Sequence, residues 1–363
     1  MIPPAPPPPV HSWRARYRRS TAALLVAAAS AAAVLLAAVL LRVGLQRRGR
    51  DPAPDATAAA LVAAPAASTP ASTPTPLPTP SADWPLARCY HAPADLGVGF
   101  VIQLAGPRSI FQGCQIIAYY GYPGVPSMGV LGSAGPEQVV ARLERQAAAY
   151  DAVNGARGVA PALELVAAVA QGSPGPDGSY VYRMPRDLLE QYLRVAREHD
   201  LLVILDLQVG RSSVQAEVEH LLPYLRDPRV NLALDPEFAM PPGKVPGVSI
   251  GTLDAATINA TQDELARLVR EAGLPDKVLV VHQFLGRMIS DKPALERVPG
   301  VNLVIDMDGF GGQAAKLSKY TRFVEDEHAP HGGIKLFYQH DAGLLTPDQV
   351  AHLRPQPDLV IYQ

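Results

Sequence analysis

The stretch VNLALDPEF (230–238) decides the fold, because a short apolar run ends abruptly in acidic residues. Five more segments have the same form: LLVILDLQ (201–208), KVLVVHQF (277–284), VNLVIDMDGF (301–310), GIKLFYQHD (333–341) and DLVIYQ (358–363). A parallel strand covered on both faces is apolar almost throughout, so polar residues at its end need a reason. Helix-like stretches separate these segments, and this alternation predicts a parallel sheet.

Two more strands are expected upstream, at CQIIAYYGYPG (114–124) and GVAPALELVAAVAQG (158–172). Helices are expected at 136–155, 185–200, 213–227, 261–273, 313–326 and 346–353, and the connection 285–300 is only weakly helical. Thr261 with Glu264 forms a capping-box signature, and Thr346-Pro347 is a good helix start. Eight strand–helix units in about 250 residues predict an α/β fold, a (β/α)8 TIM barrel over residues 114–363. The alternative is an open doubly wound sheet, but no glycine-rich phosphate motif follows any strand.

The first 83 residues do not have a globular composition. Residues 1–20 are an arginine-rich tail, and residues 21–41 are uncharged and long enough for a transmembrane helix. Residues 42–83, rich in Pro, Ala and Thr, predict a disordered stalk, and residues 84–113 an N-terminal extension with a hairpin at VGFVIQL (98–104). An anchor followed by a stalk is typical of single-pass cell-membrane proteins whose C-terminal domain lies outside the cytoplasm, with the tail inside.

Charge separates along the chain. Residues 1–50 hold eight arginines and no acidic residue, which leaves 24 basic and 34 acidic residues in the remainder. Such an acidic remainder is a poor partner for nucleic acid, and an acidic cleft would suit neutral or cationic ligands, sugars among them. The two cysteines, Cys89 and Cys114, could form a disulfide outside the cytoplasm or remain unpaired thiols; we expect the disulfide.

Strand side chains alternate between two faces, so Asp235 and Glu237 are predicted to point together into the barrel mouth. Asp206 would point inward from the third strand. The strand ends supply nine substrate-binding candidates: Tyr120, Gln208, His282, Gln283, Asp306, Asp308, Tyr338, Gln339 and Gln363. Neighbours such as His282 and Gln283 point to opposite faces of a strand, so the strand register decides which of the two faces the barrel interior. Acids that share a desolvated mouth raise one another's pKa, and glycoside hydrolysis needs a protonated acid beside an ionised carboxylate.

The segment LALDPEF (232–238) resembles the Asp-x-Glu ending of strand four in barrel glycosidases of the chitinase and bacterial-muramidase type. The resemblance implies that Glu237 is the general acid and that Asp235 positions and stabilises the N-acetyl group of the substrate. The final IYQ (361–363) is similar to the aromatic–Gln ending of the last muramidase strand. The chain departs from both patterns: Ala233 stands where chitinases have a further Asp, and the first strand ends in AYYGYPG (118–124) where muramidases have an Asp.

The sequence therefore predicts a membrane-anchored glycoside hydrolase that acts on cell-envelope or extracellular polysaccharide, with Glu237, Asp235 and Asp206 as catalytic residues. Its partners would be a glycan and, through residues 21–41, the membrane. One alternative is a barrel that binds glycan without cleaving it. Another is a metal-dependent hydrolase that uses His282, Asp306, Asp308 and His340, but the common hydrolytic metal motifs are absent, so we expect no metal and no cofactor.

Overall fold

The computed structural model describes residues 88–91, 100–103 and 109–363. The predicted tail (1–20), membrane span (21–41) and stalk (42–83) lie outside the described residues. Among the described helices, none has the length and apolar character needed to cross a membrane.

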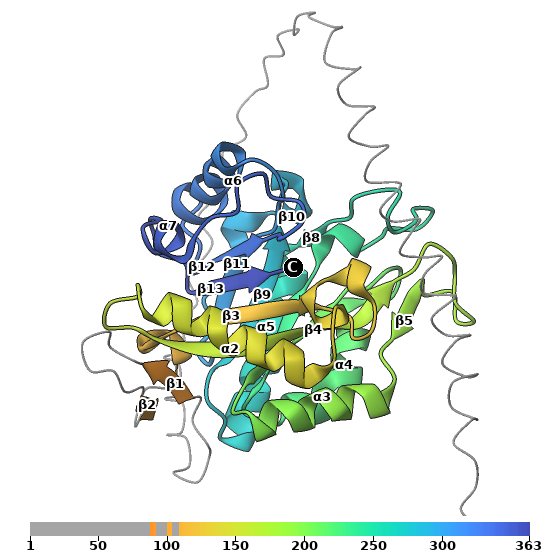
Figure 1. Cartoon of the computed structure of the whole chain (residues 1–363). Helices are drawn as coiled ribbons and strands as arrows, with labels where there is room; N and C mark the ends of the chain where they lie inside the picture. Colours follow the sequence, from red (N-terminus) through yellow and green to blue (C-terminus); the bar gives the residue numbers. More distant parts are fainter. Residues whose placement is uncertain (1–87, 92–99, 104–108) are drawn as a thin grey trace, which may run out of the picture.

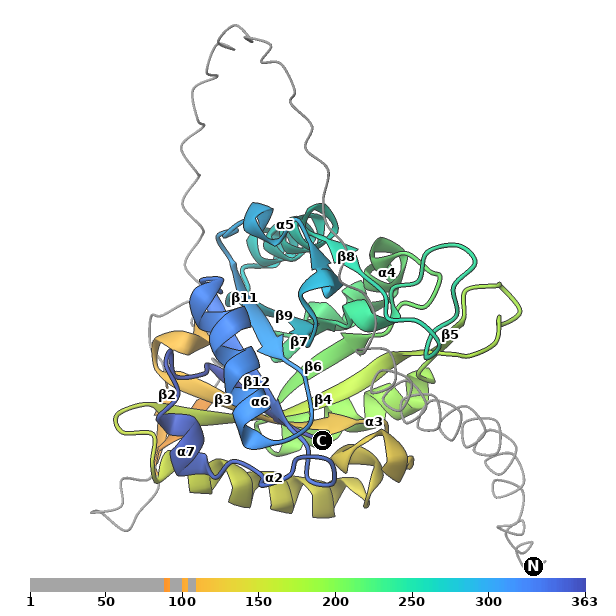
Figure 2. The ribbon, with the colours of Figure 1, turned by 90° about the horizontal axis from the view of Figure 1, so that it is seen from above.

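Eight parallel strands form a closed barrel, as the sequence predicts (Figures 1 and 2). They are β3 (Cys114–Gly121), β4 (Gly158–Ala170), β6 (Leu202–Leu207), β7 (Val230–Leu234), β9 (Lys277–Gln283), β11 (Val301–Met307), β12 (His331–Leu336) and β13 (Leu359–Tyr362). Each strand pairs in parallel with the next one in this order, and β13 pairs with β3. The alternative of an open sheet is therefore wrong.

Helices lie on the outside of this sheet in Figures 1 and 2: α2 (Pro136–Asp151), α3 (Arg186–Glu198), α4 (Val214–Leu225), α5 (Ala255–Ala272), α6 (Gln313–Tyr320) and α7 (Pro347–Ala351). A π-helical turn, η7 (Thr321–Asp326), extends α6. The weakly helical connection after β9 consists of η5 (Gly286–Met288), β10 (Ile289–Ser290) and η6 (Lys292–Ala294).

The start of α5 differs from the prediction, whereas the start of α7 agrees with it. The Asp254 side chain accepts a hydrogen bond from Thr257 N, and α5 begins at Ala255, six residues earlier than expected. Thr261 therefore lies inside the helix, where its hydroxyl donates to the Thr257 carbonyl, and the predicted capping box at Thr261 is wrong. At α7, Thr346 and Gln349 form a capping box.

Smaller elements extend the barrel at both ends. A hairpin of β1 (Arg88–His91) and β2 (Phe100–Gln103) joins the start of β4 through the pair Tyr90–Val159. Short turns η1 (Ile110–Gln112), η2 (Pro126–Met128) and η3 (Val130–Gly132) flank β3 and α2. The connection after β4 carries β5 (Val181–Arg183), which pairs with β4, and the long connection after β7 carries β8 (Leu253–Asp254), which pairs with β10.

Two strands end earlier than the polar endings suggested. β7 stops at Leu234, and residues Pro236–Phe238 form a 3-10 turn, η4, because Pro236 has no N–H for the sheet and Asp235 accepts the N–H of Glu237. β12 stops at Leu336, so residues 338–340 lie in a turn. Strand alternation therefore does not place Glu237, Tyr338 or Gln339. Glu237 nevertheless lines the cleft together with Asp235, as predicted, whereas Tyr338 and Gln339 do not.

Cys114 lies fully buried at the start of β3 and is disulfide-bonded. The side chain of Cys89 is not among those that the structure describes, so the predicted Cys89–Cys114 pairing stays a prediction.

Candidate active site at the barrel mouth

A cleft of about 2410 Å³ opens at the carboxyl ends of the barrel strands. Gln208, Asp235 and Asp308, which directly follow β6, β7 and the end of β11, line it, as does the long segment between η4 and β8. Small-molecule pockets measure about 300–1,000 Å³. The cleft therefore has room for an extended ligand.

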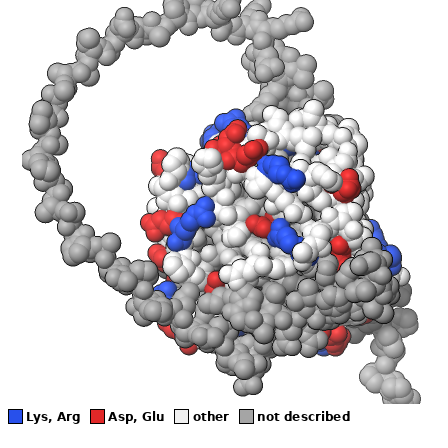
Figure 3. Space-filling view, turned by 90° about the vertical axis from the view of Figure 1, so that its left-hand side faces the viewer, with Lys and Arg blue, Asp and Glu red and all other residues white. Residues whose placement is uncertain are grey.

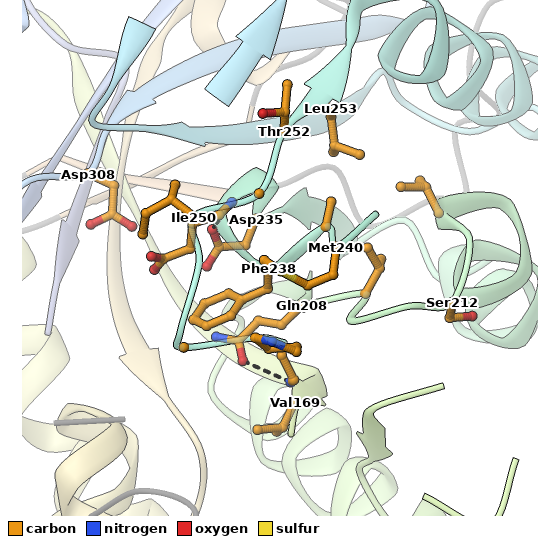
Figure 4. A pocket seen from close by; sticks show the side chains of 18 of the residues that line it. Val169, Gln208, Ser212, Asp235, Phe238, Met240, Ile250, Thr252, Leu253 and Asp308 are labelled. Carbon is orange, nitrogen blue, oxygen red and sulfur yellow. Dashed lines mark hydrogen bonds between the residues drawn. The ribbon is translucent and has the colours of Figure 1, made fainter. Parts of the chain in front are cut away.

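Asp235 and Glu237 lie on one wall of the cleft (Figure 4 labels Asp235). Asp235 is 3% exposed and caps η4, whereas Glu237 is half-buried in that turn. The backbone holds this turn in place, because Gly251 N donates to the Glu237 carbonyl at 2.6 Å. A side chain at Gly251 could not fit, since its Cβ would lie 2.3 Å from the Ala239 carbonyl oxygen.

Lys335 on β12 places a positive charge at the base of the cleft. Its ammonium group donates to Asp308 Oδ2 at 3.1 Å and lies 3.6 Å from the ring centre of Tyr120 on β3. Tyr120 in turn donates to Asp206 Oδ2 at 3.3 Å and accepts from Gln208 Nε2 at 3.2 Å. Five side chains from four strand ends thus form one connected network.

His282 lies beneath this network, fully buried on β9. Its Nδ1 is 3.0 Å from Asp306 Oδ2 on the neighbouring strand, and its Nε2 is 3.1 Å from Glu164 Oε1 on β4. Because both ring nitrogens face carboxylates, the ring is suited to the doubly protonated, cationic form. The register of β9 and β11 places His282 directly beside Asp306, and Gly333 on β12 leaves room for the Asp306 carboxylate.

The acids of this network differ in charge state. Burial raises the pKa of Asp206 to about 7, although His282 opposes the shift, and burial together with Asp206 raises that of Asp235 to about 8. Burial and then Asp235 raise the pKa of Glu237. Burial would also raise the pKa of Asp308, but Lys335 and His282 outweigh it, so that this pKa is lowered. At neutral pH the wall therefore carries a largely protonated Asp235 beside an ionised Asp308, and the pKa of Glu237 is shifted in the same direction as that of Asp235.

Deeper in the barrel, burial raises the pKa of Asp306 against the opposing effect of His282. Burial and Lys335 oppose protonation of His282, but hydrogen bonds to Asp306 and Glu164 outweigh them and raise its pKa. Three buried carboxylate oxygens have no hydrogen-bond partner in the described part of the chain: Glu164 Oε2, Asp206 Oδ1 and Asp306 Oδ1. The ligand atoms of His282, Asp306 and Asp308 lie within 4.8 Å of one another, so these residues could hold a metal ion.

Other predicted site residues lie away from this centre. Gln283 is buried but faces the opposite way, where its Oε1 accepts from Lys292 at 2.7 Å. Tyr338 stacks on Tyr362 at 5.1 Å and donates to Gln146, outside the cleft lining, and Gln339 is exposed in the same turn. Gln363 does line the cleft.

Sequence reasoning missed Glu164 and Lys335. Each lies within an apolar run instead of after it, and the signal that could have revealed each of them is a single charged residue in a strand that is otherwise buried.

Acidic and basic side chains are interspersed on the face that Figure 3 shows, with no broad patch of one sign among the residues described there.

No protein-family model matches the chain, and no curated protein matches it. It is similar to a solved hyperthermophilic endo-β-1,4-glucanase in complex with substrate, with 11% identity and a TM-score of 0.33 over 70% of this chain and 91% of that chain. It is also similar to the structure of ZgEngAGH5_4 in complex with a cellotriose, with 10% identity and a TM-score of 0.35 over 72% of this chain and 91% of that chain. Both likenesses are distant, and the function of the site has to be derived from its own residues.

Proposed function

We propose that this domain is a glycoside hydrolase that acts on a polysaccharide. The observation that supports it is the pairing on one cleft wall of Glu237, whose pKa is raised by burial and by Asp235, with Asp308, whose pKa is lowered by Lys335 and His282. Glycoside hydrolysis needs both forms, because an acid protonates the leaving oxygen while a carboxylate stabilises or attacks the oxocarbenium-like centre.

In this mechanism Glu237 donates the proton, since it is the acid of the pair that is half-open to the cleft. Asp308 is the carboxylate, kept ionised by Lys335. Asp235 is buried beside Glu237, so that ionisation of Asp235 raises the pKa of Glu237, and in its protonated form Asp235 can donate a hydrogen bond to a polar substituent of the sugar. Asp206 lies beneath this wall and accepts a hydrogen bond from the Tyr120 hydroxyl.

The test is release of reducing ends by the full-length protein from peptidoglycan, chitin and exopolysaccharides. We expect Glu237→Gln to lower kcat at least about 100-fold, because general acid catalysis contributes about 10²–10⁴-fold. Glu219→Gln is the matched control, since Glu219 is an exposed acid on α4 that lines the same cleft. Equal loss in both variants would refute the role of Glu237. Binding without release by the wild type would favour the non-catalytic glycan-binding barrel.

We also propose that the domain is displayed outside the cytoplasm on a membrane anchor. The uncharged residues 21–41 and the Pro-rich stalk after them support this placement. Protease treatment of intact cells tests it: cleavage in the stalk should release the domain, and a domain that resists until the cells are lysed would contradict it.

A metal-dependent hydrolase is the second candidate, because His282, Asp306 and Asp308 converge. His340 is not part of that group: it is exposed and packs against Phe310. Three contacts weigh against an ion: the carboxylate at each of the two ring nitrogens of His282, and the Lys335 ammonium on Asp308. Elemental analysis of the purified protein decides between the two: a stoichiometric metal whose removal abolishes turnover would support this candidate.

A further inference from the structure

The ring of Phe310 is 48% exposed, although it follows the buried Asp308 by only two residues. It packs against the rings of Phe337 at 5.8 Å and His340 at 5.7 Å, and all three rings line the cleft. Exposing so large an apolar side chain costs free energy of hydration, and its ring neighbours hold it in place. Phe310 is therefore a fixed aromatic surface beside the proposed catalytic wall.

A lysine lies next to this surface. The Lys319 ammonium on α6 approaches the backbone of Gly309 so closely that a Cβ there would be 3.1 Å from it. In the described part of the chain, Lys319 forms no ion pair and donates no side-chain hydrogen bond, and it lines the cleft. Lys316, one turn earlier on the same helix, is instead buried and paired with Asp341 at 2.9 Å. Lys319 thus offers an unused positive charge to a ligand.

The charge of the cleft lining differs from that of the acidic domain. Its acidic residues are Glu219, Asp235, Glu237, Glu264 and Asp308. Its basic residues are Lys244, Arg267, Arg287, Lys319 and Lys335. The two sets are equal in number, but burial raises the pKa of Asp235 to about 8 and that of Glu237 in the same direction, while Glu264 and Asp308 are paired with Arg267 and Lys335. With Asp235 protonated, the lining is net positive, contrary to the expectation from the acidic charge of residues 51–363.

We propose that Phe310 and Lys319 form a subsite for a pyranose ring that carries a carboxylate, such as a uronic acid residue of an acidic polysaccharide. The apolar C–H face of the sugar lies on the Phe310 ring, and its carboxylate accepts a charge-assisted hydrogen bond from the Lys319 ammonium. This subsite rests on the proposed function and specifies its substrate class.

The experiment compares two probes that share a linkage and differ in the carboxylate: β-1,4-linked glucuronate hexamers and cellohexaose. Alginate and polygalacturonate hexamers extend the anionic set. Kd is measured by calorimetry on the full chain and on four variants, Phe310→Ala, Phe310→Trp, Lys319→Gln and Arg270→Gln. Arg270 is an exposed cation on α5 outside the cleft lining, so its variant controls for overall charge.

We expect the wild type to bind at least one anionic hexamer about tenfold or more tightly than cellohexaose, since a hydrogen bond to a charged group contributes about 1.5–3 kcal/mol. Lys319→Gln should remove that preference and Arg270→Gln should keep it. Phe310→Ala should weaken binding of both probe classes, and Phe310→Trp should retain it.

Tighter binding of cellohexaose than of the anionic hexamers, or an unchanged preference in Lys319→Gln, would overturn the proposed subsite. The proposed hydrolase function would still stand if Glu237→Gln loses turnover. Wild-type affinity of Phe310→Ala for the hexamers would also overturn the subsite. No binding of any hexamer, together with no turnover on any polysaccharide, would overturn both proposals.

Discussion

Asp235 shows how burial at a single residue sets the chemistry of the cleft wall. Its carboxyl is almost fully buried, and its pKa of about 8 lies well above the ordinary value of 3.8. A group whose pKa is raised on folding favours the folded state at low pH, and this contribution is lost as the pH rises through the folded value. The ionised form of Asp235 is therefore a cost that the fold bears at alkaline pH.

We predict that Asp235→Asn becomes more stable relative to the wild type as the pH rises from about 4 to about 8, by on the order of a few kcal/mol. The amide cannot ionise, and its oxygen can still accept the hydrogen bond from Glu237 N. Urea unfolding of both proteins at each pH measures the difference. Parallel stability curves would show that Asp235 titrates normally.

At the scale of one element, strand β9 carries a second unusual charge at the end of the barrel opposite the cleft. Lys277 is fully buried, and its ammonium donates to the carbonyls of Asp227 and Val230, both at 2.7 Å. Burial lowers its pKa to about 7, against the small opposing effect of Asp227. These hydrogen bonds tie the first residue of β9 to the entry of β7.

Because the unfolded chain holds this proton up to about pH 10.5, Lys277 makes the fold more stable as the pH rises from about 7 to about 10. We predict that Lys277→Met lacks this increase, although the variant loses two buried hydrogen bonds to backbone carbonyls and is less stable at the upper end. Chemical denaturation of both proteins at several pH values in that window tests it. If the stability of the variant rose equally between about pH 7 and pH 10, a group other than Lys277 would cause the increase.

At the scale of the whole molecule, the buried ionisable groups change the folding stability in opposite directions as the pH rises. Asp206, Asp235, Asp306, Glu237 and His282 all have raised pKa values, so their contributions are lost as the pH rises. Lys277 contributes in the opposite sense above about pH 7. We predict the highest Tm in mildly acidic buffer, a decline to about pH 8 and a partial recovery toward pH 10. Calorimetry across this range tests the curve, and a Tm that rises steadily from acid to neutral pH would contradict it.

The barrel was predictable from the sequence because each buried strand is a short apolar run, and helix-like segments separate the runs. The ends of the elements were less predictable. Pro236 stops β7 before Glu237, and Asp254 starts α5 before Thr261, so that local hydrogen bonds override the longer pattern.

The site was predictable only where its residues lie among the last residues of a strand, such as Asp206 and Asp306, or directly after it. Asp235 and Asp308 stand at such positions, and the structure brings both to the cleft. Glu164 and Lys335 lie inside apolar runs, where nothing in the sequence indicates which partner compensates their charge. Register across the closed sheet supplies those partners, and one sequence does not reveal it.

The position of His282 between Glu164 and Asp306 limits how this barrel can change over evolution. Removing the imidazole would leave Glu164 and Asp306 without the cation that contacts both of them, and removing one carboxylate would alter the protonation of the others. Substitutions within the cluster should therefore be strongly epistatic, so that a single change is deleterious where a compensated pair is tolerated. A laboratory lineage that acquires a new activity in this barrel would have to replace these buried groups in sets, while the walls of the cleft can vary one residue at a time.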